Sequence, residues 1–130
     1  MNYLVSDFVS RIKNAALAHR KQVVLVYSKL CKEIGINLVK ERVLEEIKEE
    51  ERDGKKVLVA KIRYVQRNPV FSDLTVVSKP SLRVYIKKHT IHLRERKGIQ
   101  GLMLSTSKGV MSGKEAKKQG LGGELLFEVW

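Results

Sequence analysis

The sequence predicts an α+β fold made of two small lobes, on three observations. Apolar residues recur at helical spacing near the amino terminus, an Asp53-Gly54 pair separates two strand-like segments, and the second half is rich in short strands. The expected division is an N-terminal α/β lobe at 1–66, a linker at 67–73, and a C-terminal mainly-β lobe with one short helix at 74–130. A chain of 130 residues is long enough for both lobes.

The first lobe is expected to run helix, strand, helix, strand, strand. Its first helix has Asn2 or Ser6 as the N-cap. The apolar stripe of that helix consists of Leu4, Val5, Phe8, Val9, Ile12, Ala15 and Ala16. Residues 22–27 form a strand, and Ser28 caps a second helix, in which Gly35 costs about 1 kcal/mol relative to alanine. The apolar residues of the second helix are Leu30, Cys31, Ile34, Leu38 and Val39.

A β-hairpin follows, with strands at 43–51 and 56–65. Asp53-Gly54 lies between them, and glycine supplies the positive φ that a tight turn requires. Arg67-Asn68-Pro69 then ends the strand and begins the linker.

The second lobe is expected to be mostly β-structure. Strands at 74–78 and 82–87 flank a Lys79-Pro80-Ser81 turn, and 101–106 is a further strand. Alternation along 82–87 places Arg83, Tyr85 and Lys87 on one face and Leu82, Val84 and Ile86 on the other. The basic segment 89–97 is expected to be a loop. Ser112, three residues before Glu115, caps a helix at 112–119, glycines 120, 122 and 123 end it, and 124–130 is the closing strand.

The most informative property of the composition is the formal net charge of +12, with a pI near 10. Such a chain is attracted to polyanions, because each neutralised phosphate releases condensed counterions. The charge is uneven: residues 41–53 carry seven acidic and three basic side chains, a local net charge of −4. We therefore expect this segment to face away from the polyanion. A folded protein whose lysines only keep it soluble is the plainer alternative.

The remaining composition narrows the class of protein. No apolar stretch approaches the roughly 18 residues needed to cross a membrane, and the amino terminus lacks the pattern of a secretory signal. Cys31 is the only cysteine, so an internal disulfide is excluded and a reducing compartment fits. The expected location is the cytoplasm.

The densest polar segment is Ser105-Thr106-Ser107-Lys108-Gly109, which follows an apolar strand. Hydroxyls and backbone N–H groups donate to phosphate oxygens and lysine adds charge, so this segment suits phosphate and ribose contacts; a strand end with a turn is the alternative. An exposed Tyr85 could stack on an unpaired base beside Arg83, or it could be a half-buried sheet residue. Gly122 and Gly123 either allow close approach to a ligand or only form a turn.

Enzyme motifs are absent or incomplete. Ser105 to Lys108 matches S-x-x-K without its K-T-G partner, and 109–114 is one residue short of a phosphate-binding P-loop. His89, His92 and Glu95 have the spacing of weak metal ligands but lie in a basic segment without a fourth ligand. The glutamates at 45, 46 and 49–51 form no defined acid–base pair. We expect no catalysis, metal, cofactor or small-molecule substrate.

Several segments resemble bacterial-type small-subunit ribosomal protein eight. The strongest likeness is at the carboxyl end, in residues 104–110, Glu115-Ala116, 122–125 and the terminal Glu128-Val129-Trp130. Residues 11–15 are similar to the amino-terminal signature of that family, and Asp53-Gly54-Lys55 to its hairpin. Ser78-Lys79-Pro80 followed by Arg83-Val84-Tyr85 resembles its middle segment.

The resemblance implies a structural protein of the small ribosomal subunit that binds the central domain of its rRNA directly, at an irregular helix with a bulged core, and aids assembly. It also implies contacts with neighbouring proteins, such as ribosomal protein five, and in some members repression of their own mRNA. Cytoplasmic and organellar ribosomes both fit. The implied RNA-binding residues are Arg11, Lys13, Asn14, Lys79, Pro80, Arg83, Tyr85, Ser105, Thr106, Ser107, Lys108, Gly109, Gly122, Gly123 and Glu124.

Three features depart from the pattern of the family. Arg42 stands where glycine is usual after the second helix, the segment after Tyr64 is short and has a single proline, Pro69, and the acidic cluster at 41–53 is heavy.

Two other classes of protein stay open: a basic nuclease or transferase, whose activity would depend on added metal, and a DNA-binding regulator, for which no helix-turn-helix or heptad seam is evident. Preference for bulged RNA over duplex DNA would distinguish an RNA-binding ribosomal protein from these alternatives.

Overall fold

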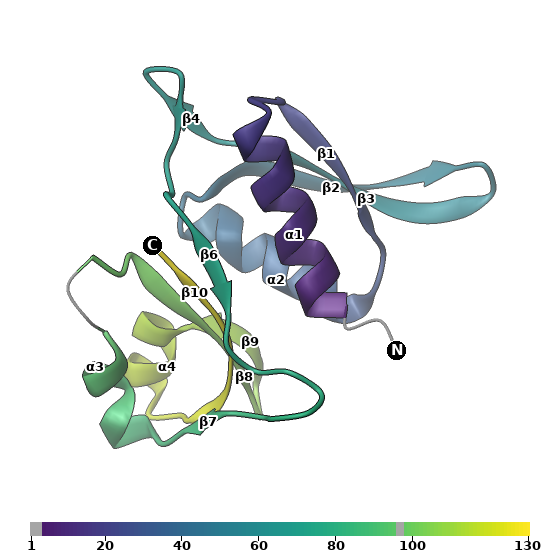
Figure 1. Cartoon of the computed structure of the whole chain (residues 1–130). Coiled ribbons are helices and arrows are strands. Elements are labelled where there is room, and N and C mark those ends of the chain that lie inside the picture. The colour runs from purple at the N-terminus through teal and green to yellow at the C-terminus, as the bar shows by residue number, and fades with distance from the viewer. Residues whose placement is uncertain (1–3, 96–97) are drawn as a thin grey trace. The chain divides into compact units, whose positions relative to one another are not determined.

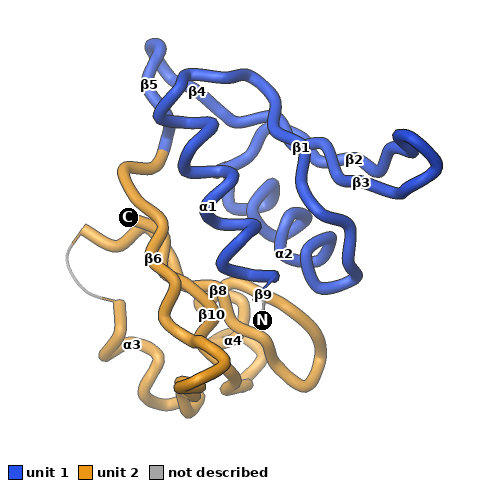
Figure 2. Tube along the Cα trace, turned by 45° about the vertical axis from the view of Figure 1, so that its right-hand side comes forward, with its two compact units in different colours: residues 1–70 blue, residues 71–130 orange. Residues whose placement is uncertain are grey.

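A computed structural model describes residues 4–95 and 98–130, so the expected cap Asn2 lies outside the described residues. The chain forms two compact units, Met1–Val70 and Phe71–Trp130 (Figure 2). The change of unit falls inside the segment expected as a linker, while the boundaries 1–66, 67–73 and 74–130 stay a prediction. In the described part of the chain, no helix is both long and apolar enough to span a membrane.

Unit 1 has the expected order of elements. They are α1 (Leu4–Leu17), β1 (Gln22–Val26), α2 (Lys29–Lys40), β2 (Leu44–Arg52) and β3 (Lys55–Ile62). The strands form an antiparallel sheet in the order β1-β3-β2. Helix α1 packs against β1, and α2 packs against β2. Gly35 permits the second contact, because a Cβ there would lie 2.0 Å from Cδ1 of Ile47.

The helix ends of unit 1 follow local rules with one correction. Ser28 caps α2 as predicted, its hydroxyl accepting from the Cys31 N–H at 3.0 Å. Ser6 is not a cap, because α1 already includes it. After α2 the chain turns through Arg42, whose φ is 62°. The Arg42 N–H donates to the carbonyl of Val39, and the next N–H to that of Leu38, a helix ending that favours glycine.

Two hairpins complete unit 1. Asp53 and Gly54 have φ of 52° and 77°, the conformation of the predicted tight turn, and Figure 1 shows the β2–β3 hairpin reaching past the helices. A second, smaller hairpin was not predicted: β4 (Tyr64–Val65) pairs with β5 (Asn68–Pro69). The expected strand at 56–65 therefore ends early, because the chain reverses at Gln66 and Arg67, both at positive φ.

Unit 2 is built around its last strand. Its elements are β6 (Leu74–Val76), β7 (Tyr85–Ile86), the 3-10 helix η1 (Lys88–Thr90), α3 (Ile91–Arg94), β8 (Gly101–Thr106), β9 (Gly109–Ser112), α4 (Gly113–Gln119) and β10 (Gly123–Val129). The sheet order is β6-β10-β8-β9, and β7 also pairs with β10. A buried apolar cluster joins the sheet to the helices: Ile91, Leu102, Leu104, Met111, Ala116 and Leu125.

Three expectations for unit 2 need correction. Of the segment expected as a loop, 89–97, residues 96–97 lie outside the described residues, and 91–94 are helical because Ile91 is fully buried and anchors them; η1 and α3 thus precede the predicted helix, and the lobe is mainly β as expected. The expected strand at 82–87 shrinks to β7, and Leu82 is exposed. Strand β9 was not predicted. The Ser112 cap is confirmed, its hydroxyl accepting from the Glu115 N–H at 3.2 Å.

Candidate nucleic-acid interface

A row of side chains crosses three neighbouring strands of unit 2. Tyr85 on β7 pairs with Glu124 on β10, and Glu124 pairs with Ser105 on β8. Paired residues project from the same face of a sheet, so the three side chains share the face opposite Leu104 and Leu125 of the apolar cluster. Tyr85 is 71% exposed, so the alternative of a half-buried sheet tyrosine is wrong. The row brings together residues that are widely separated in sequence.

The carboxylate of Glu124 fixes this row to the preceding segment. Its Oε2 accepts from the Ser78 hydroxyl at 2.5 Å and from Nη1 of Arg83 at 3.1 Å. The oxygen of Ser78 in turn accepts from the Val84 N–H at 3.1 Å. Glu124 therefore acts as a positioning residue that orders the segment carrying Tyr85, and its charge is already matched by the guanidinium of Arg83.

Ser78 is the site residue that the sequence analysis missed. It is fully buried just after β6, and its hydroxyl bonds both to the Glu124 carboxylate and to the Val84 N–H. A signal existed: Leu74, Val76 and Ser78 alternate, which assigns Ser78 to the buried side of the strand. A buried hydroxyl needs a partner.

The segment 105–109 is a hairpin turn between β8 and β9, with Ser107 and Lys108 exposed at its tip. The Thr106 hydroxyl donates to the Gly109 carbonyl at 2.8 Å and accepts from the Lys108 N–H at 3.2 Å. Thr106 thus shapes the turn from within. Among residues 4–95 and 98–130, the side chains of Ser107 and Lys108 have no hydrogen bond or ion pair, so both are available to a ligand.

Gly122 and Gly123 let the strands approach closely. A Cβ at Gly122 would lie 2.4 Å from the Ile86 carbonyl oxygen, and one at Gly123 would lie 2.2 Å from that of Ser105. Both distances are far below van der Waals contact, so only glycine fits. The two glycines thus serve the packing of β7 and β8 beside β10, and through it the row of Tyr85, Glu124 and Ser105.

Two further groups of predicted residues lie elsewhere. Lys79 and Pro80 are exposed in a turn that is closed by paired hydrogen bonds of 3.0 Å between Lys79 and Leu82. In unit 1, Arg11 and Asn14 line a cleft of about 460 Å³ beside β1. Arg11 is held there by the carboxylate of Asp7 at 3.0 Å and the Val24 carbonyl at 3.3 Å. Lys13, also on α1, is half-buried.

The β2–β3 hairpin, called here the acidic hairpin because β2 carries the glutamates at 45, 46 and 49–51, has several of these side chains in ion pairs with nearby cations. It does not arrange them as a catalytic acid–base pair. Glu49 pairs with Lys32 at 2.6 Å, and Glu50 pairs with Arg52 at 3.0 Å. These cations hold the pKa of Glu49 and of Glu50 below the ordinary carboxyl value. In the described ranges, no three His, Cys, Asp or Glu residues group as metal ligands. Burial raises the pKa of the Cys31 thiol, which keeps it in its unreactive form.

Comparisons with known proteins cover nearly the whole chain. The family model for ribosomal protein S8 matches residues 4–130. Small ribosomal subunit protein uS8 of Caldanaerobacter subterraneus is 41% identical over 128 residues, covering 97% of this chain and 96% of the relative. The uS8 protein of Acidobacterium capsulatum is 37% identical over 127 residues, covering 97% and 96%, and uS8c of Guillardia theta is 37% identical over 131 residues, covering 99% and 98%. The chain therefore belongs to the ribosomal protein S8 family.

Proposed function

We propose that this protein binds the central domain of small-subunit rRNA directly and aids its assembly, gripping an irregular, bulged helix with unit 2. Membership of the ribosomal protein S8 family makes the protein a structural, non-enzymatic component of the ribosome. Both enzyme alternatives, a nuclease and a transferase, are thereby set aside. The relatives' names refer to the small subunit, and the proposal takes its RNA partner from that subunit.

The observation that carries the proposal is the row of Tyr85, Glu124 and Ser105 beside the exposed tip of Ser107 and Lys108. An exposed aromatic ring stacks on an unpaired base, and this requires a base that has left its helix. A lysine at a turn neutralises a phosphate. The combination suits a bulged RNA core, in which unstacked bases and closely spaced phosphates occur together.

Each residue then has its own task. Tyr85 supplies the stacking surface, Ser107 donates to or accepts from a base or ribose, and Lys108 contacts the backbone. Glu124 and Ser78 hold the row in place before RNA arrives, because their hydrogen bonds already exist in the free protein. A preformed site does not lose binding free energy to ordering its own side chains.

Two roles extend this proposal. The same grip on an mRNA that folds into a similar bulged helix would repress its translation, and surfaces outside the RNA site would contact neighbouring proteins such as ribosomal protein five. The 41–53 hairpin, with its local net charge of −4, suits a basic protein better than RNA.

The direct test is ultraviolet crosslinking of the protein in ribosomes of its host, followed by sequencing of the bound RNA and mass spectrometry of the crosslinked peptides. We expect reads concentrated at one bulged helix in the central domain of small-subunit rRNA, and crosslinks in peptides that contain Tyr85 or Ser107. Reads spread evenly over ribosomal RNA, or crosslinks confined to the acidic hairpin, would contradict the proposal.

A further inference from the structure

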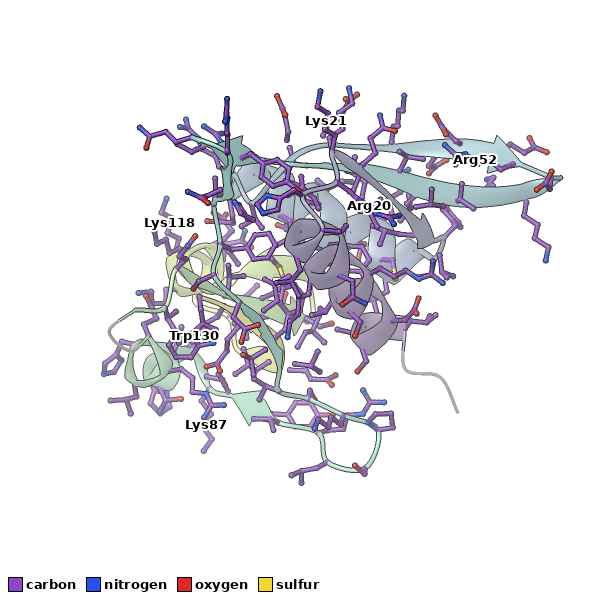
Figure 3. The ribbon with its side chains drawn as sticks, turned by 45° about the horizontal axis from the view of Figure 1, so that its top comes forward. Arg20, Lys21, Arg52, Lys87, Lys118 and Trp130 are labelled. Carbon is purple, nitrogen blue, oxygen red and sulfur yellow. The ribbon has the colours of Figure 1, made fainter. Side chains whose placement is uncertain are left out.

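Strand β2 is an uncovered edge of the sheet in unit 1. In the order β1-β3-β2 it has a partner strand on one side only. Among residues 4–95 and 98–130, no segment other than β3 hydrogen-bonds to its backbone. Six of its nine residues are exposed, and Figure 3 shows Arg52, its last residue, on the part of the acidic hairpin that extends past α1. This side of the sheet has room for a further strand.

The pairing geometry indicates which backbone groups of β2 are free. The Ile62 N–H donates to the Lys21 carbonyl at 3.0 Å, so the backbone groups of Ile62 point toward β1 and those of its neighbour Lys61 toward β2. Because the direction alternates along each strand, the residues of β2 that pair with Lys61, Val59 and Val57 use their backbone groups on β3. The remaining N–H and C=O groups point away from the sheet, and we call them the β2 edge: those of Ile47, Glu49 and Glu51.

The opposite edge of the same sheet is already in use. Val24 of β1 pairs with Val59 of β3, and its carbonyl accepts from Nη1 of Arg11 at 3.3 Å. Helix α1, which carries Arg11, packs against β1. A guest strand at β1 would have to displace this arginine, so of the two edges β2 is the one open to a partner.

The features that usually protect an edge strand are mostly missing from β2. Such strands are kept from pairing with another chain by a short length, a proline, a bulge or charge. Strand β2 has no proline, and its one irregularity lies between Leu44 and Glu46. From Glu46 to Arg52 the register with β3 is continuous, a length of about 20 Å. Charge is the remaining protection.

That charge selects the partner by its sign. Strand β2 has five glutamates against Lys48 and Arg52, a net charge of −3. Like charges on neighbouring strands are destabilising and opposite charges are stabilising. The β2 edge therefore repels a second copy of itself and any acidic strand, and it favours a strand rich in lysine or arginine.

Glutamates lie on both faces of β2, so a guest strand would meet carboxylates on either side. Glu49 pairs with Lys32 on the face toward α2 at 2.6 Å, and alternation places Glu46 on the other face. Glu45 and Glu51 are exposed and, within the described part of the chain, have no ion pair. These two carboxylates lie near the two ends of the strand and are available to cations of a guest.

We propose that the β2 edge binds an extended, basic segment of a neighbouring protein by β-strand addition. The backbone of the guest bonds to Ile47, Glu49 and Glu51, and its lysines or arginines pair with the glutamates. Main-chain hydrogen bonds then supply affinity, and charge supplies the choice of partner. A basic tail without a fold of its own would become ordered on this edge. The inference deepens the proposed contact with neighbouring proteins, on which it rests for the class of partner, and it requires no RNA.

The test titrates full-length, RNA-free protein with a fluorescent peptide of nine residues, the length of β2, in which lysine and valine alternate. We expect binding that weakens as salt is added. At saturation, amide hydrogen exchange should slow by about tenfold or more at Ile47, Glu49 and Glu51, because their N–H groups gain partners. The same peptide with N-methyl groups on successive central residues keeps its charge but cannot donate from either edge, so it should bind about tenfold more weakly.

A matched pair of variants separates backbone pairing from charge. Glu49→Pro and Glu49→Gln remove the same carboxylate and its pair with Lys32, but only proline also lacks the N–H that points to the guest. We expect Glu49→Gln to retain most of the peptide affinity and Glu49→Pro to bind about tenfold more weakly than Glu49→Gln. Melting curves show whether both variants are folded. If the proline variant is not, the methylated peptide on the unaltered protein still decides the matter.

Three results would overturn the proposal. Equal affinity for the parent and methylated peptides would reduce the effect to charge alone. Absence of peptide binding, or protection confined to residues outside β2, would show that the edge is not used. Protection of the β2 edge by a blunt RNA duplex, added in place of the peptide, would assign the edge to nucleic acid.

The two proposals can fail separately. If bulged RNA does not bind, the proposed function of unit 2 fails. The peptide titration contains no RNA, so it still decides whether the β2 edge accepts a basic strand.

Discussion

The hydroxyl of Ser78 donates to Oε2 of Glu124 at 2.5 Å, across 46 residues of sequence. Ser78 is fully buried, and its oxygen also accepts from the Val84 N–H. One small side chain thus joins the end of β6, the segment that leads to Tyr85, and the first residues of β10. This connection tethers the segment that carries Tyr85 to β10, so we expect the stability and the RNA binding of the protein to be linked through it.

Replacement of Ser78 should therefore affect both properties. Ser78→Ala leaves a carboxylate oxygen and a backbone N–H without this partner, which should lower the free energy of unfolding by about 1–3 kcal/mol. Preference for bulged RNA over plain duplex should also fall, because the segment carrying Tyr85 loses its tether. Denaturant unfolding and paired binding curves measure these effects. Ser81→Ala, in the exposed turn nearby, is the control and should change neither; an unaltered Ser78→Ala protein would show that the network is dispensable.

Arg42 offers a prediction about stability alone. Its φ of 62° is the left-handed conformation that ends α2, and a glycine there avoids a penalty of about 1–3 kcal/mol at a smaller cost in chain entropy. Arg42→Gly should thus raise the melting temperature without affecting RNA binding. Lys40→Gly, at the last residue of α2, should instead lower it, by at most about 1 kcal/mol. A drop in stability for Arg42→Gly would mean that the arginine side chain has contacts that outweigh the strain.

Tyr85 should matter for binding and little for folding. Because the residue is 71% exposed, Tyr85→Ala should leave the melting temperature almost unchanged and weaken bulged-RNA binding by about 1–3 kcal/mol, the value of a stacked base. Tyr85→Phe keeps the ring and should keep most of the affinity. Thermal melts and binding curves of both variants decide the matter: a collapse of folding in the alanine variant, with normal binding by what remains folded, would make the residue structural.

The acidic hairpin should be neutral toward RNA. Replacing Glu49, Glu50 and Glu51 by glutamine should leave affinity for bulged RNA nearly unchanged at moderate salt, apart from a small gain from relieved long-range repulsion. The ion pairs that lower the pKa of Glu49 and Glu50 favour the folded state at neutral pH, and this contribution is lost as the pH falls through the carboxyl range. Fluorescence anisotropy measures the affinity; a large loss with the fold intact would place this hairpin inside the site.

Much of the fold could be predicted from the sequence where short-range chemistry determines it. Ser28 and Ser112 cap helices because a hydroxyl reaches an N–H three residues later, and Asp53-Gly54 turns because glycine tolerates positive φ. The missed features depend on contacts between distant segments. The basic segment around Ile91 is helical because the Ile91 side chain packs into the core of unit 2. No local sequence pattern predicts this helix.

The same distinction applies to the candidate site. Alternation along the strand predicted that Tyr85 faces away from Ile86, and the exposure of Tyr85 agrees. Composition could not show that the Thr106 hydroxyl is used inside its own turn, nor that Gly123 serves the contact between two strands. Those roles follow from hairpin geometry and strand pairing, which require the register of β8, β9 and β10.

The most direct test of the central claim, that the tip of the β8–β9 hairpin grips bulged RNA, is salt-titrated binding of Lys108→Ala and Ser107→Ala to a bulged hairpin and to a plain duplex. Removal of Lys108 should weaken both RNAs and flatten the log–log salt slope by about 0.7–0.9, the value of one phosphate contact. Removal of the Ser107 hydroxyl should leave the slope alone and reduce the preference for bulged RNA by about 1–3 kcal/mol, because a polar group of the RNA loses its partner. Equal slopes and unchanged selectivity in both variants would contradict the assignment of this hairpin as the RNA-gripping element.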